Sequence, residues 1–127
     1  MELRKTGLVL LALLLATMAL VPMVSANGTV SSNSYGSDIG SSIKYYGVGS
    51  HSATPAPSYM NVKVIIDDSV YGTSPEQTHT VPCYNTNTCT TPNYYYSPST
   101  PGYYYVITTV DADGHGTVSN TQSVYFS

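Results

Sequence analysis

The stretch Tyr103–Val110 constrains the fold more than any other part of the chain. Its eight residues are tyrosine, valine, isoleucine or threonine without a break, which is the composition of a β-strand. The polar segment Asp111–Gly116 follows, and its two glycines suit the positive φ angles of a tight reversal. Thr117–Phe126 then alternates again and ends in an aromatic pair. The pattern predicts a β-hairpin that supplies the last two strands of a sandwich.

Residues 1–26 have the organisation of a signal peptide. Arg4 and Lys5 make a basic start, Leu8–Val21 is an apolar run, and Val24-Ser25-Ala26 is a small-residue cleavage site. The run is about 14 residues long, whereas a membrane-spanning helix needs roughly 20. An uncleaved anchor is the alternative. We expect cleavage after Ala26 and a secreted or cell-surface location.

The chain after residue 26 is poor in residues that favour helices. All leucines and the single arginine lie before this point, and all 13 tyrosines lie after it. We therefore predict a small antiparallel β-sandwich at residues 43–127. The polar segment at residues 27–42 is expected to be an arm, either flexible or paired to a sheet edge.

Tyr59–Asp67 is the clearest strand outside the hairpin. Apolar side chains occupy every position of one face, as in a strand that covers a core; these are Met60, Val62, Val64 and Ile66. Shorter strands are predicted at Ile43–Val48 and Gln77–Cys83, and a long proline-containing loop at Tyr84–Gly102. Five or six strands result. In the hairpin, Tyr103–Val110 is expected to be central and the return strand an edge.

Cys83 and Cys89 are the two cysteines of the chain and enclose five residues. In an exported protein such a pair predicts a disulfide that closes a small loop. A redox or metal-binding pair is the alternative, but the spacing is not C-x-x-C and no third ligand lies nearby in the sequence. The disulfide is the favoured interpretation.

The segment Asp111–Val118 has the spacing of the first eight positions of a calcium-binding loop. Asp111 and Asp113 stand at positions one and three, glycine at six and valine at eight. Position twelve is Gln122 instead of the bidentate glutamate, and the flanking segments are predicted strands. A calcium site here would be of low affinity, with a Kd of roughly 10⁻⁴–10⁻³ M. The alternative, a polar hairpin turn, is favoured, and no other cofactor is expected.

No catalytic constellation is apparent. His51, His79 and His115 lie far apart without a ligand-spacing pattern, and the chain has no G-x-S-x-G motif. Two lysines against six carboxylates after residue 26 give a net charge of −4, so no basic patch predicts nucleic-acid or anionic-membrane binding. We expect a protein that is not an enzyme.

The tyrosine clusters are the candidate interaction surface. Tyrosine offers a large contact area at a low entropic cost, and consecutive tyrosines on a strand must point to both faces. The candidates are Tyr45, Tyr46, Tyr94, Tyr95, Tyr96, Tyr103 and Tyr105. Core filling in a leucine-free domain is the alternative. Self-association, other extracellular proteins and glycans are the expected partners. Asn27 begins an N-glycosylation sequon.

Gly102–Phe126 resembles the closing strands of immunoglobulin-like modules on microbial surface proteins, in which a G-x-Y-x-V strand followed by a D-x-D-G turn is common. The resemblance implies a sandwich fold with a structural or adhesive role, in which a polar N-terminal arm joins subunits into an extracellular fibre. It implies no site residues.

A second resemblance is to secreted β-sandwich bacteriocins of the lactococcin type. Motifs of that family appear in the same order here, at Gly28-Thr29, Tyr35-Gly36, Tyr45-Tyr46, His51-Ser52-Ala53-Thr54 and Tyr125-Phe126. The family's tryptophans are missing, and residues 59–100 have the place of an insertion. This resemblance implies an antibacterial polypeptide as the alternative function.

Overall fold

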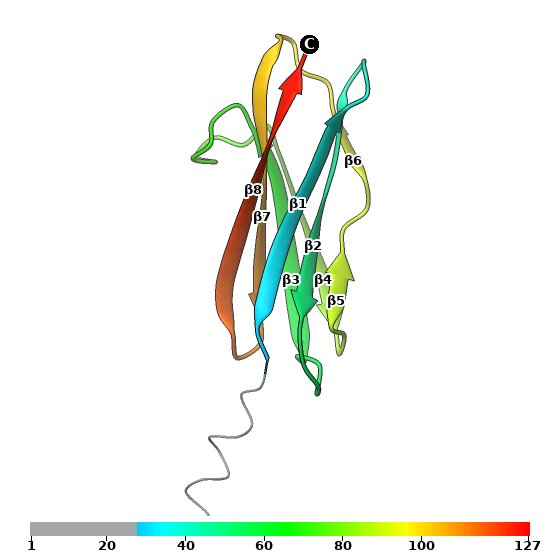
Figure 1. The fold of residues 1–127 in the computed structure, drawn as a ribbon, viewed down its shortest axis with the longest axis vertical. Coiled ribbons are helices and arrows are strands. Elements are labelled where there is room, and N and C mark those ends of the chain that lie inside the picture. Colours follow the sequence, from blue (N-terminus) through cyan, green and yellow to red (C-terminus); the bar gives the residue numbers. More distant parts are fainter. Residues whose placement is uncertain (1–27) are drawn as a thin grey trace, which may run out of the picture.

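The structure is a computed structural model, and it describes residues 28–127 as eight β-strands and their connections (Figure 1). The strands are β1 (Val30–Asp38), β2 (Ile43–His51), β3 (Tyr59–Asp67), β4 (Gln77–Tyr84), β5 (Thr88–Thr90), β6 (Tyr94–Tyr96), β7 (Gly102–Ala112) and β8 (Gly116–Phe126). No helix occurs in this part of the chain, as its composition predicts.

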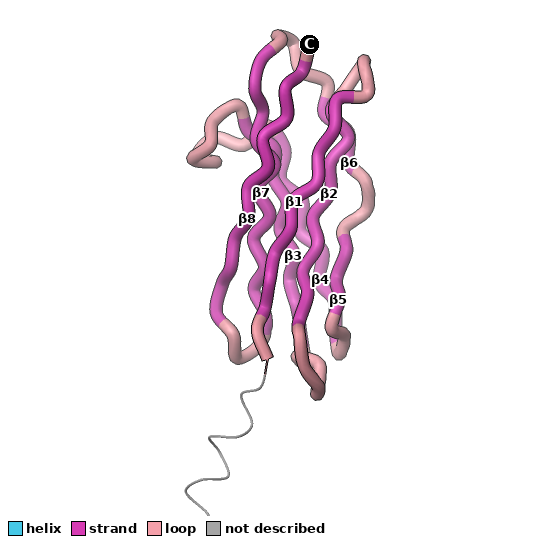
Figure 2. Tube along the Cα trace, in the orientation of Figure 1, coloured by secondary structure: helices cyan, strands magenta, loops and turns pink. Residues whose placement is uncertain are grey.

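The strands form two four-stranded antiparallel sheets that pack face to face (Figure 2). In sheet A, β2 pairs with β1 on one side and with the short strands β5 and β6 on the other. Sheet B has the order β4-β3-β7-β8. The predicted all-β sandwich is confirmed, and so are the central place of β7 and the edge position of β8.

Alternating apolar side chains build the core from sheet B. The four predicted positions of β3, from Met60 to Ile66, are all fully buried. On β7 the buried face carries Tyr104, Val106, Thr108 and Val110. Each strand therefore contributes every second residue to the core, as the pleat requires.

A hydrogen-bonded polar pair, Ser34 and Thr108, separates two apolar clusters of this core. Ser34 Oγ accepts a hydrogen bond from Thr108 N at 3.0 Å and shares a second hydrogen bond with Thr108 Oγ1 at 2.9 Å. Beside them, a Cβ atom on Gly47 would lie 2.6 Å from Thr108 Oγ1, so only glycine allows the two sheets to come this close. One cluster surrounds Tyr45 and the other surrounds Met60.

The segment predicted as an arm at residues 27–42 is part of the sandwich. β1 pairs with β2 from Val30 opposite His51 to Asp38 opposite Ile43, so the edge-paired alternative applies to residues 30–38 and the flexible one does not. The sandwich thus begins at β1 instead of at residue 43. Asn27 and the predicted signal peptide lie outside the described residues.

The predicted loop Tyr84–Gly102 contains two strands. β5 and β6 pair with β2 at different points along its length, and Thr91 lies between them. Thr91 N donates to Gly47 O at 3.0 Å, and Thr91 Oγ1 accepts from Gly47 N at 3.0 Å. The sequence analysis missed these strands because three-residue strands show no periodicity, and the total is therefore eight instead of five or six.

The seam between β1 and β8, called here the amide seam, joins the two sheets through side-chain amides. Asn120 Oδ1 accepts a hydrogen bond from Ser34 N at 3.0 Å, and Gln122 Oε1 accepts one from Gly36 N at 2.8 Å. Ser34 Oγ also donates to Asn120 O at 2.7 Å. The two amides thus bond two backbone N–H groups on the open edge of β1, an edge that another strand could otherwise pair with.

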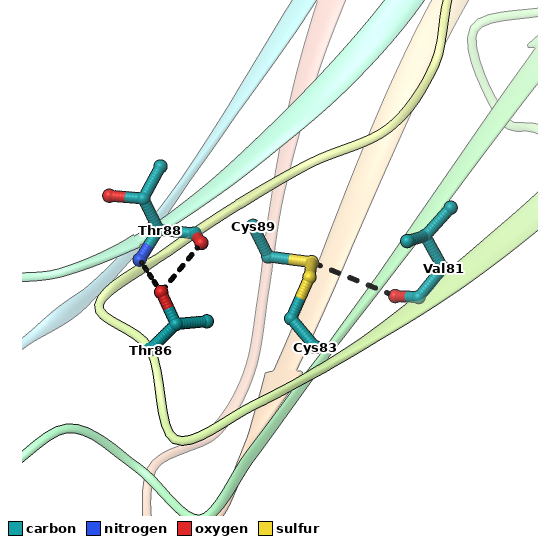
Figure 3. The surroundings of a disulfide bond; sticks show 5 residues. All are labelled: Val81, Cys83, Thr86, Thr88 and Cys89. Carbon is teal, nitrogen blue, oxygen red and sulfur yellow. Dashed lines mark hydrogen bonds between the residues drawn. A yellow bond between two sulfur atoms is a disulfide. The ribbon is translucent and has the colours of Figure 1, made fainter.

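The opposite seam, between β4 and the strands β5 and β6, is called here the disulfide seam. Cys83 of β4 and Cys89 of β5 form the predicted disulfide, with a Cα–Cα distance of 5.8 Å (Figure 3). Farther along β4, the His79 ring stacks on Tyr94 at 3.6 Å between centroids. Gln77 accepts a hydrogen bond from the Tyr45 hydroxyl at 2.6 Å and donates one to Tyr95 O at 3.2 Å.

Candidate functional site

The outer side of sheet A is the most distinctive surface of the described chain. It is called here the sheet A face. Because alternate residues of β1 and β2 point into the core, the others point outward. The outward residues are Ser31, Asn33, Tyr35, Ser37, Lys44, Tyr46, Val48, Ser50, Thr88, Thr90 and Tyr95.

Three tyrosines and one lysine form the centre of this face. Tyr35 is directly opposite Tyr46, and their rings stack with centroids 4.7 Å apart and planes 12° from parallel. Lys44 lies two residues from Tyr46 on β2, with Ser37 opposite it on one side and Tyr95 on the other. Tyr35 and Tyr95 are 42% and 54% exposed.

Charge is distributed unevenly between this face and the rest of the sandwich. Lys44 is the one charged residue that points outward from sheet A. The carboxylate of Asp38, at the end of β1, accepts hydrogen bonds from Gly40 N and Ser127 N, which lower its pKa. The other carboxylates belong to β3, to β7 or to the connections that follow these two strands. The sheet A face is therefore weakly cationic on an acidic protein.

The structure divides the predicted interaction tyrosines into four groups. Tyr46 and Tyr95 belong to the sheet A face, whereas Tyr103 and Tyr105 point outward from sheet B. Tyr94 and Tyr96 are partly buried against the core. Tyr45 is fully buried, so its assignment to a surface was wrong. Strand alternation is the physical reason, because neighbouring tyrosines on one strand must face opposite sides.

Burial also changes the acid–base behaviour of the inward tyrosines. Loss of solvent raises the pKa of Tyr45, and the nearby Tyr94 raises it further. Burial is likewise the largest cause of the raised pKa of Tyr96, followed by the negative charge of Glu76. These phenols therefore stay protonated to a higher pH than an exposed tyrosine.

Sequence analysis missed four exposed tyrosines. Besides Tyr35, Tyr71 is 84% exposed in the β3–β4 loop, Tyr84 is 68% exposed and Tyr125 is 54% exposed. Tyr125 contacts the Tyr103 ring edge-on at 5.1 Å. None of the four stands next to another tyrosine in the sequence, whereas the candidate surface was predicted from consecutive tyrosines. For Tyr35 the missing signal was the pairing of β1 with β2.

The turn Asp111–Gly116 is built by backbone geometry and one carboxylate. Gly114 and Gly116 adopt φ angles of +78° and +68°, and His115 N donates to Ala112 O at 3.1 Å. Asp113 Oδ2 accepts a hydrogen bond from Ser58 Oγ at 2.5 Å, whereas Asp111 stays on the outer side of β7. Among residues 28–127, no three His, Cys, Asp or Glu side chains group as metal ligands.

The fold brings two of the three histidines together, which their separation in sequence did not predict. His51 and His115 contact edge-to-face with ring centroids 4.7 Å apart. His51 is buried, and its Nδ1 lies 2.9 Å from Asn87 Oδ1. His79 belongs to the disulfide seam, and its Nε2 atom is buried without a hydrogen-bond partner.

No pocket is present among the described residues. Residues 28–127 also contain no apolar helix of membrane-spanning length.

Comparison with known proteins supports the fold alone. No family model and no curated protein sequence matches the chain. A solved structure that does match is the CARDB domain of the PF1109 protein from Pyrococcus furiosus, crystallised in complex with di-metal ions. The TM-score is 0.51 at 14% sequence identity, over 79% of this chain and 96% of that domain. The likeness agrees with the predicted immunoglobulin-like type of sandwich.

Proposed function

We propose that this protein is a non-enzymatic extracellular β-sandwich with a structural or adhesive role at the cell surface. The observation that carries the proposal is the sheet A face, an open, tyrosine-rich surface on a domain whose described residues form no pocket. An open surface suits extended partners, whereas catalytic and small-molecule sites are concave. The fold shared with the CARDB domain is compatible with such a module.

The Cys83–Cys89 disulfide supports an extracellular location. Disulfides persist in oxidising compartments and are rare in the cytosol. The expected signal peptide at residues 1–26 points the same way, and cleavage after Ala26 would leave the sandwich with a free start just before β1.

Assembly into fibres is part of the proposal, but donation of the N-terminal arm does not explain it. β1 fills its own sheet, and two N–H groups of its open edge are bonded in the amide seam. Contacts between subunits would therefore use faces or the outer edge of β4. The antibacterial alternative has no structural observation in its favour, because residues 59–100 supply β3 to β6 and cannot be an insertion into a sandwich that already exists.

Cell fractionation combined with an attachment assay tests the proposal. We expect the chain in the culture medium or on intact cells, with its disulfide formed, and weaker attachment or aggregation by cells that lack it. A chain retained inside the cell, or unchanged attachment and surface integrity without it, would contradict the proposal. Size measurement over a range of concentrations tests the fibre role, and a strict monomer throughout would exclude it.

A further inference from the structure

We infer that the sheet A face binds an acidic polysaccharide, with sugar rings on Tyr35, Tyr46 and Tyr95 and a sugar carboxylate at Lys44. This inference rests on the adhesive role proposed above and specifies its ligand class. It follows from three properties of the face: its aromatic surface, its isolated positive charge and its limited area.

The aromatic surface is suited to sugar rings. A pyranose ring has an apolar side made of C–H groups, and this side packs on the electron-rich face of an aromatic ring. Tyr35 and Tyr46 stack on one another, and Tyr35 is 42% exposed, so part of this aromatic pair is open to a ligand. Tyr95 continues the aromatic surface across β6, on the far side of Lys44. The spacing of the strands thus sets aromatic groups on both sides of the cation.

Lys44 supplies the preference for acidic sugars. Its ammonium group forms no ion pair within the described residues, and the residues that surround it on the face are serine and tyrosine. Asp111 and Asp113 lie at the opposite end of the sandwich, near the β7–β8 turn (Figure 1). Two carboxylates lie nearer to Lys44: Asp38 follows Ser37 on β1 and is bonded by Gly40 N and Ser127 N, and Glu76 lies near Tyr96 of β6. The face itself carries the single charge of Lys44, with these carboxylates at its border.

The limited area favours a polysaccharide over a protein. Strands of nine residues are about 30 Å long, and three strands side by side are about 14 Å wide, so the face covers roughly 400 Å². A stable protein interface buries about 800 Å² on each partner.

The border of the face provides hydrogen-bonding groups for sugar hydroxyls. Serine, threonine and asparagine side chains both donate and accept, as sugar hydroxyls do. They surround the aromatic centre; these residues are Ser31, Asn33, Ser37, Ser50, Thr88 and Thr90.

Binding of the full-length, disulfide-intact protein to polygalacturonate, with dextran as the neutral comparison, tests the inference. We expect binding to polygalacturonate that weakens as salt is added, and little binding to dextran. Tyr46→Ser should weaken binding roughly tenfold, which is in the range of stacking contributions in open binding grooves. Lys44→Gln should weaken it about fivefold or more and remove most of the salt dependence.

Matched controls come from the other sheet. Lys63 and Tyr84 are exposed on the outer side of sheet B, so Lys63→Gln and Tyr84→Ser should leave binding unchanged. Circular dichroism and the melting temperature establish that each variant is folded, and Tyr46→Phe should restore most of the affinity.

Four results would overturn the inference. They are no binding by the folded wild type, equal binding to dextran, equal losses in the Lys44→Gln and Lys63→Gln variants, and a dimer of the chain that Tyr46→Ser abolishes. Any of these could occur while cells still depend on the protein for attachment, so the adhesive role would survive. Conversely, a chain that binds polygalacturonate through Lys44 but stays inside the cell would overturn only the proposed location and role.

Discussion

The amide seam and the disulfide seam join the same two sheets by opposite means. At the amide seam, Asn120 and Gln122 bond to backbone groups of β1. At the disulfide seam, the Cys83–Cys89 bond and the stack of His79 on Tyr94 connect side chain to side chain. The first seam holds only in one register, because each amide must meet one particular N–H. At the second seam the ring stack can shift slightly, while the disulfide keeps β4 and β5 together covalently.

The difference shows how a domain without leucine can still fix the position of its two sheets relative to one another. Hydrogen bonds contribute only about 0.5–1.5 kcal/mol each, so the amide seam contributes more to the choice of register than to stability. The disulfide and the aromatic contacts supply stability on the other side. If this division holds, substitutions at the disulfide seam should cost more than substitutions at the amide seam.

The largest loss of stability is expected for Tyr45→Ala. It removes a fully buried ring that contacts Tyr94 and His79 and donates to Gln77. The unfolding free energy should fall by about 3–5 kcal/mol, as for other buried aromatic truncations. Tyr46→Ala is the control on the adjacent, outward position and should cost less than about 1 kcal/mol. Denaturant unfolding measures both, and similar losses would contradict the assignment of Tyr45 to the core.

Removal of the disulfide is the next largest expected effect. Replacement of Cys83 and Cys89 by serine should lower the unfolding free energy by about 2 kcal/mol, because the closed loop is short. The protein should still fold, since the aromatic contacts of the seam remain. Thermal unfolding of the double variant, beside the wild type with and without reductant, measures the effect. An unfolded variant would mean that the bond organises the whole edge.

Asn120→Ala removes one amide of the amide seam and should lower the unfolding free energy by about 1–2 kcal/mol. The loss arises because Ser34 N is left without its acceptor in a partly buried position. Asn120→Asp retains an acceptor oxygen and should lose less, and Thr121→Ala, on the exposed outer side of β8, should be neutral. A cost above that of the disulfide would reverse the comparison between the seams.

Unfolding measurements at alkaline pH test the raised pKa of Tyr45, whose ring contacts His79 and Tyr94 of the disulfide seam. The raised pKa of Tyr45 means that the folded protein keeps a proton that the unfolded chain loses above about pH 10. Its stability contribution is complete below that pH and should decline above it by about 1.4 kcal/mol per pH unit. Tyr45→Phe removes this group, so its unfolding free energy should decline less steeply. Equal slopes for variant and wild type would contradict the prediction.

The smallest change in stability is expected for Asp38→Asn, at the end of the amide seam. Hydrogen bonds from Gly40 N and Ser127 N lower the pKa of this carboxylate, so its contribution is present above the pKa of the unfolded state, near 3.9. The contribution is lost as the pH falls through the lowered pKa of the folded state. The melting temperatures of variant and wild type should differ slightly at neutral pH and converge near pH 2. A constant difference would exclude the ionised form as the cause.

The strongly periodic strands could be predicted from the sequence, and the seams could not. β3 and β7 place an apolar or threonine side chain at every second position, and both were predicted as strands, with the buried face identified for β3 alone. β1 presents Ser34 and Gly36 to the interior, which carry no apolar signal. Gly36 leaves no room for a larger side chain, because a Cβ atom there would lie 2.7 Å from Val124 and 2.8 Å from Val106. The backbone N–H groups of Ser34 and Gly36 meet the amides of β8, 86 positions away in the chain.

The candidate surface was predicted in composition but not in geometry. Consecutive tyrosines on a strand must face both ways, but which of Tyr45 and Tyr46 is buried depends on the register of β2 against its neighbours. Tyr35 joined the surface only through that register. The charge of the sheet A face likewise became visible only when pairing placed Lys44 between Ser37 and Tyr95.

The amide seam also determines how the domain would carry mechanical tension. β1 and β8 run side by side in the same direction, and the described chain starts at one end of the long axis and finishes at the other (Figure 1). Pulling on the two ends therefore slides the first and last strands past one another. The bonds of Ser34, Gly36 and Asp38 to β8 and Ser127 then bear the load together instead of opening one after another. A domain with this arrangement should unfold at a higher pulling force than one in which the same few seam bonds break one after another.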